Sequence, residues 1–126
     1  MTGMLLHLPS RRLLWFGIVG APLAWAAQEW LGWLLASERC RPRGQAMALA
    51  SGGLVAMHLL ALLVAVAALM AGVRGVRRAR AAPPDNVVMV DRFLATAGTV
   101  ISAAGIVALI WGSLGTWMLA ACEVMR

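Results

Sequence analysis

Charged side chains are scarce in this chain of 126 residues, and lysine is absent. Only 13% of the residues are charged and 62% are hydrophobic, whereas an ordinary soluble domain is about 25% charged. A chain this short has too little interior to remove so much apolar surface from water. The composition therefore excludes most soluble enzymes and disordered tails, and it predicts that a lipid bilayer supplies the missing interior.

The net charge of +6 comes from arginine alone, since all eleven basic residues are arginines. An isoelectric point near 11.6 would suit a nucleic-acid-binding module, but these arginines flank apolar runs instead of lying on a polar module. We therefore expect membrane-flanking charge and no nucleic-acid partner.

Motifs for catalysis and metal binding are also lacking. The sequence has no CxxC pair, no HExxH, no P-loop and no dinucleotide-binding glycine motif, each of which places specific ligands or backbone amides at a fixed spacing. We expect a chain that is not an enzyme, has no cofactor and takes no soluble substrate. Its function should then lie within the membrane or at the two membrane surfaces.

Three apolar runs are present, at about 13–36, 46–73 and 93–121. Each exceeds the roughly 20 residues that a membrane span needs. The first run is also longer than the roughly 7–15 apolar residues of a signal peptide. The sequence predicts an all-α membrane protein, one transmembrane domain over 1–126 with three transmembrane helices and a basic loop at 74–92.

The arginines predict the orientation of these helices. One set precedes the first run or follows the second, and it comprises Arg11, Arg12, Arg74, Arg77, Arg78, Arg80 and Arg92. The other set is smaller and comprises Arg39, Arg41, Arg43 and Arg126. Because the more basic side faces the cytoplasm, we expect a cytoplasmic N-terminus and a periplasmic C-terminus in a bacterial inner membrane. In the basic loop, Pro83 and Pro84 should end the second helix, and Asp85 should cap the third.

Rows of small residues recur at helical spacing on all three runs. Such rows let helix backbones approach closely, which drives association in lipid, although alanine can also simply face lipid. The predicted packing positions are Gly20, Ala24, Gly32, Gly98, Ser102, Gly105 and Gly112.

Polar residues inside the predicted spans are the candidate functional residues. Glu29 lies roughly 10 Å inside the first run at 1.5 Å per residue, where an ionisable group is costly and marks a site by default. It could carry protons or a ligand, or it could be a structural carboxyl that Gln28 satisfies. His58 lies about 7 Å deeper by the same rise, and Ser113 lies level with Glu29. A relay between Glu29 and His58, a structural histidine and a haem ligand all remain open.

The two cysteines, Cys40 and Cys122, follow the first and third runs and fall on the same predicted face. In an oxidising periplasm two such thiols should form a disulfide. The alternative is a copper(I) site with Met47 or Met125, since soft sulfur ligands suit that ion.

The pattern GAPLAWAAQEWLGWLLASERC, the histidine in the second run, DRFLATAGTVIS and the last cysteine resemble small three-span proteobacterial membrane proteins found alongside haem–copper terminal oxidases. The sequence departs from that pattern at Ala120 and Ala121, where the relatives have a proline before the final cysteine. The residues that carry the resemblance are Gly20, Pro22, Ala24, Trp25, Gln28, Glu29, Cys40, Arg92, Phe93 and Cys122.

The resemblance implies an accessory or assembly role in a larger membrane complex such as a respiratory terminal oxidase. Two other functions fit the residues. A small proton-coupled transporter would use Glu29, and a periplasmic thiol- or copper-handling protein would use Cys40 and Cys122.

Overall fold

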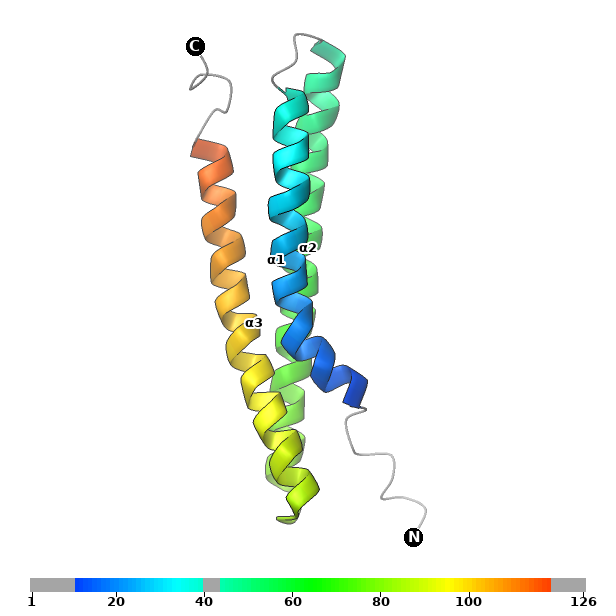
Figure 1. The fold of residues 1–126 in the computed structure, drawn as a ribbon, viewed down its shortest axis with the longest axis vertical. Coiled ribbons are helices and arrows are strands. Elements are labelled where there is room, and N and C mark those ends of the chain that lie inside the picture. Colours follow the sequence, from blue (N-terminus) through cyan, green and yellow to red (C-terminus); the bar gives the residue numbers. More distant parts are fainter. Residues whose placement is uncertain (1–10, 40–43, 119–126) are drawn as a thin grey trace.

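The structure, a computed structural model, describes the backbone of residues 11–39 and 44–118 and the side chains of 11–34 and 52–114. Helix α1 spans Arg11–Arg39, α2 spans Gly44–Ala81 and α3 spans Asn86–Met118. The three helices lie side by side in an elongated bundle, with α2 antiparallel to both neighbours (Figure 1). The predicted all-helical fold is confirmed.

Two of the helices are long and apolar enough to cross a membrane. They correspond to Gly52–Ala81, with a mean hydropathy of 2.6, and Asn86–Leu114, with a mean hydropathy of 2.1. The described part of α1 does not reach the same level, because Gln28, Glu29 and Pro22 interrupt its apolar residues. Length and composition thus support a membrane protein with two candidate spans.

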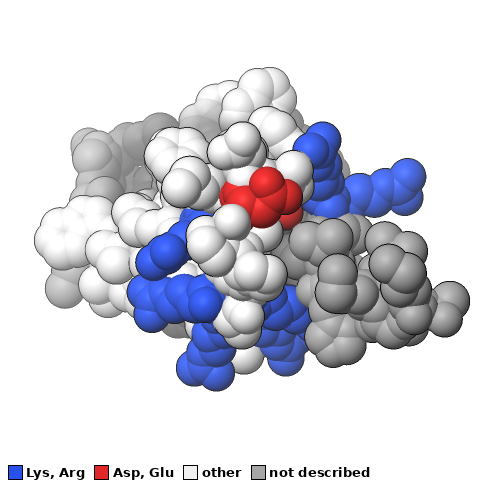
Figure 2. Space-filling model, turned by 90° about the horizontal axis from the view of Figure 1, so that it is seen from below, with Lys and Arg blue, Asp and Glu red and all other residues white. Residues whose placement is uncertain are grey.

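The helices α2 and α3 continue beyond the apolar runs, so most of the predicted basic segment at 74–92 is helical. Only residues 82–85 connect the two helices. Arginine and alanine are good helix formers, so α2 continues to Ala81 and stops just before Pro83, as the prolines predict. Asp85 caps α3 as expected: its carbonyl accepts the amide of Met89 at 2.9 Å and its carboxylate accepts the amide of Asn86 at 2.7 Å. Arginine side chains surround this end of the bundle (Figure 2).

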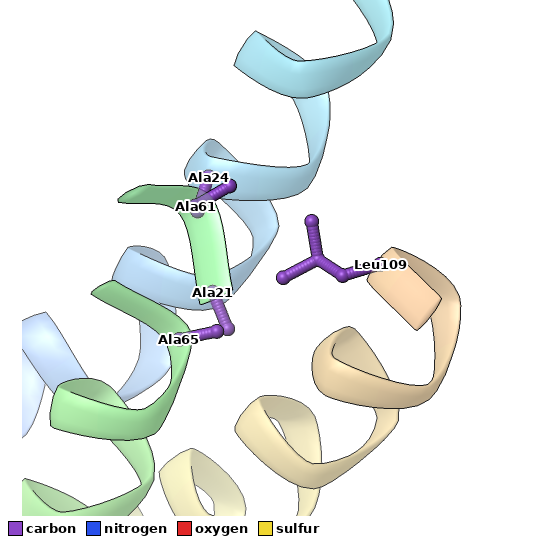
Figure 3. Close-up of a cluster of buried hydrophobic side chains, with 5 residues drawn as sticks. All are labelled: Ala21, Ala24, Ala61, Ala65 and Leu109. Atoms are coloured by element: carbon purple, nitrogen blue, oxygen red, sulfur yellow. The ribbon is translucent and has the colours of Figure 1, made fainter. Parts of the chain in front are cut away.

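Small side chains form the centre of the bundle. Ala21 and Ala24 of α1 lie against Ala65 and Ala61 of α2. Leu109 points from α3 towards these four alanines (Figure 3). Alanine leaves the backbones close together, and close contact stabilises helix pairs where lipid offers no hydrophobic driving force.

The helices approach each other more closely still in the half of the bundle where α1 begins, α2 ends and α3 begins, because glycines lie at the contacts there. A Cβ atom on Gly72 would lie 2.9 Å from the backbone nitrogen of Thr99, and one on Gly98 would lie 3.1 Å from the carbonyl carbon of Gly17. In the same region the buried Ser102 hydroxyl donates a hydrogen bond of 2.7 Å to the Gly17 carbonyl. Contacts of this kind hold α3 against both α1 and α2.

Proline bends α1. Pro22 lies inside the helix and has no amide hydrogen for the carbonyl of Ile18, so the helix kinks near this point. The first turns of α1 accordingly lean away from the axis of the rest of the helix (Figure 1).

Candidate functional site

The four polar residues singled out from the sequence lie at nearly one level of the bundle. Contacts between neighbouring helices set this register. Gly32 of α1 lies against Met57 of α2, since a Cβ on Gly32 would be 3.6 Å from the Met57 Cε, and this places His58 beside the level of Leu31. A Cβ on Gly112 of α3 would lie 2.8 Å from Glu29 Oε1. We call Gln28, Glu29, His58 and Ser113 the polar layer.

The register corrects the depth predicted for His58. The predicted difference of about 7 Å in depth between His58 and Glu29 assumes that the first and second apolar runs end at the same height. Instead α2 begins further out than α1 ends (Figure 1), so His58 lies level with residues just beyond Glu29. The antiparallel register that pairs Gly72 with Thr99 also brings His58 level with Ser113.

Gln28 is the buried member of the polar layer, with 4% of its surface exposed. Its amide nitrogen donates to the Leu109 carbonyl of α3 over 3.5 Å, and the Ser113 hydroxyl donates to the same carbonyl at 2.6 Å. The Leu109 carbonyl therefore joins α1 and α3 within the layer. The Gln28 Oε1 atom is buried and accepts no hydrogen bond from the described residues, so a polar group remains to be satisfied there.

Glu29 has a different environment from its neighbour. It is exposed on the surface of the bundle, at the seam where α1 meets Gly112 of α3. The adjacent Trp30 and the nearby Trp33 are 78% and 72% exposed. The Glu29 side chain thus lies at the edge of the interface between α1 and α3: the residue is exposed, and its Oε1 reaches the backbone of α3 at Gly112.

His58 is half-buried and is oriented by its own helix. Its Nδ1 atom lies 2.6 Å from the Leu54 carbonyl. Because a carbonyl only accepts, Nδ1 carries the hydrogen of this bond, and only Nε2 could act as an acceptor or a metal ligand. The described residues contain no group of three or more histidine, cysteine, aspartate or glutamate side chains that could hold a metal ion.

The predicted packing residues lie along the helix interfaces. Gly20, Ala24, Gly32, Gly98 and Ser102 are buried, and Gly105 and Gly112 are half-buried. The half-buried pair lies along the seam with α1, because a Cβ on Gly105 would be 2.8 Å from that of Ala21.

Several important positions were missed by the sequence analysis. Asp91, in the second turn of α3, is buried, and its Oδ1 has no hydrogen-bond partner among the described residues. Gly17 and Gly75 are also close-contact positions. The spacing of Gly75 three residues after Gly72 could have revealed it, because that spacing keeps both on one helix face.

Cys40 and Cys122 lie outside the described residues, so the disulfide stays a prediction. No family model, no curated protein and no solved structure matches this chain. By its fold, the chain is an all-helical protein with two helices apolar enough to cross a membrane.

Proposed function

We propose that this protein is a three-span protein of the bacterial inner membrane that acts as a non-catalytic accessory or assembly subunit of a larger membrane complex. The resemblance to small proteins found alongside haem–copper terminal oxidases makes a respiratory oxidase the first complex to test. In this proposal α1 is the third span, and it crosses the membrane packed against α2 and α3.

The observation that carries the proposal is the exposed side chain of Glu29, at the edge of the interface between α1 and α3. If α1 crosses the membrane, this group lies on a surface that would otherwise face hydrocarbon, where a charged side chain is costly and rare. A partner helix that donates a hydrogen bond or a positive charge would remove that cost. The exposed Trp30 and Trp33 beside it supply aromatic area of the kind enriched at protein interfaces.

The shared level of Glu29 and His58 favours a second function, a small proton-coupled transporter. In this alternative, protons would pass between the two side chains through the polar layer. The accessory role accounts better for the outward position of Glu29, because a proton path needs groups that line a protected interior. The thiol- or copper-handling alternative depends on Cys40 and Cys122 and remains a prediction from the sequence.

The proposed topology gives the first prediction. A phosphatase that is active only in the periplasm should be active when fused after Arg126 and inactive when fused at Pro83, in the connection between α2 and α3. The physical reason is the greater number of arginines beside that connection. An active fusion at Pro83 together with a silent fusion after Arg126 would refute the proposed orientation.

Gentle extraction tests the accessory role directly. The tagged full-length chain, solubilised in a mild detergent, should elute with a large membrane complex, and mass spectrometry of the proteins in that peak should find oxidase subunits in fixed proportion. A chain that elutes alone or as a homodimer from membranes in which the oxidase is intact would contradict the accessory role and favour the transporter.

A further inference from the structure

The end of the bundle where α1 begins, α2 ends and α3 begins carries a dense positive charge. We call it the arginine-rich end; its described arginines are Arg11, Arg12, Arg74, Arg77, Arg78, Arg80 and Arg92. All seven are exposed, and none forms an ion pair with a carboxylate of the described residues. Asp85 and Asp91 are the acidic residues at this end, so the positive charge is in clear excess (Figure 2).

The outward face of α2 changes abruptly from apolar to basic. Leu59, Leu63 and Met70 on this face are exposed, and the same face continues at helical spacing into Arg74, Arg77 and Arg78. In a membrane this change marks the boundary between the hydrocarbon and the lipid headgroups. Seven arginines at that boundary would lie among phosphates, which guanidinium groups bind in a bidentate manner.

A groove lies between α1 and α2, and its lining extends to Trp15 on α1 and to Val64 on α2. It is open to the outside, has a volume of about 510 Å³, and is lined by apolar side chains that include Trp15, Phe16, Leu23, Met57, Leu60 and Val64. A Cβ on Gly75 would lie 2.9 Å from the Leu14 side chain, so the adjacent Trp15 lies beside the level of Arg74. The groove extends from there to Leu31, about 24 Å along α1 at 1.5 Å per residue.

We infer that this chain binds an anionic phospholipid, with the phosphate held by Arg74, Arg77 and Arg78 and one acyl chain lying in the groove between α1 and α2. Charge and shape agree on this occupant. The exposed guanidinium groups attract an anion, and the groove, whose lining on α1 reaches Trp15 near the level of Arg74, fits a narrow apolar chain. A partner helix is about 10–12 Å across with its side chains and needs a wider surface. The inference depends on the proposed membrane location and not on the partner complex.

Native mass spectrometry of the purified full-length chain in mild detergent tests this binding. The probes are phosphatidylglycerol and phosphatidylcholine with identical acyl chains. The wild-type chain should retain phosphatidylglycerol at least about tenfold better, since each arginine near a membrane surface adds appreciable affinity for anionic lipid. The variant Arg74→Gln/Arg77→Gln/Arg78→Gln should lose this preference. The control Arg39→Gln/Arg41→Gln/Arg43→Gln, which removes the same charge elsewhere, should keep it. Equal preference in the first variant and the wild type would overturn the inference.

Two further measurements separate the headgroup from the acyl chain. Ala27 lines the groove and its neighbour Ala26 does not, although both are exposed. Ala27→Phe should reduce retention of both lipids several-fold by filling the groove, whereas Ala26→Phe should not; equal retention in the two variants would overturn the groove as the acyl site. Inorganic phosphate at millimolar concentration should leave the lipid bound. Displacement of the lipid by phosphate would show a free-phosphate site and overturn the inference as well.

Discussion

Replacing Gly72 by leucine should lower the free energy of unfolding of the bundle by about 3 kcal/mol. A Cβ at this position would lie 2.7 Å from the Thr99 hydroxyl oxygen and 2.9 Å from the Thr99 backbone nitrogen. A backbone atom cannot rotate away, so α2 and α3 must separate, and overpacking of this kind costs about 1–3 kcal/mol or more. The measurement is unfolding in mixed micelles, followed by the loss of helix content.

The same helix provides a matched control for this substitution. Nothing lies within 4 Å of a Cβ built on Gly52, and that glycine is exposed. Gly52→Leu should leave the stability unchanged or raise it by up to about 1 kcal/mol, because leucine is the better helix former. If the two variants unfold alike, close approach at Gly72 does not hold the bundle together.

The fold could be predicted from the sequence because apolar length is a strong signal. Runs of this length are rare outside membranes, and they gave three helices in the right order. The helix ends were harder to predict, because hydropathy reports where a chain leaves lipid and not where its helix stops. Proline and a capping aspartate carry that local information: α2 ends just before Pro83, and Asp85 caps the start of α3.

The candidate site was predicted less completely than the fold. The sequence identified the four residues of the polar layer, since polar groups stand out in apolar runs. It could not give their levels, because the register between helices depends on contacts such as Gly32 with Met57. It also could not show that Gln28 points inward and Glu29 outward. The two residues are adjacent, and each residue turns a helix by about 100°. Which of the two side chains points into the bundle therefore depends on how α1 packs.

The outward position of Glu29 gives a prediction in which stability and assembly change in opposite directions. Glu29→Leu should leave the isolated chain as stable as the wild type, or more stable, because it removes a carboxylate from an apolar surface. It should weaken the association with the partner complex by about 1–2 kcal/mol, the scale of an interhelical hydrogen bond in membranes. The measurements are unfolding of the purified chain and the fraction that elutes with the complex in mild detergent.

The paired variant Glu29→Gln separates the two proposed functions. A glutamine can still hydrogen-bond to a partner helix, so in the accessory role it should preserve both assembly and the activity of the complex. It cannot take up or release a proton, so in the transporter it should be as damaging as leucine while the protein remains assembled. Ala26→Leu, at an exposed position of the same helix, controls for added apolar surface. Loss of activity with intact assembly in the glutamine variant would assign Glu29 to proton transfer, whereas full activity together with loss of the complex in the leucine variant would assign it to the partner interface.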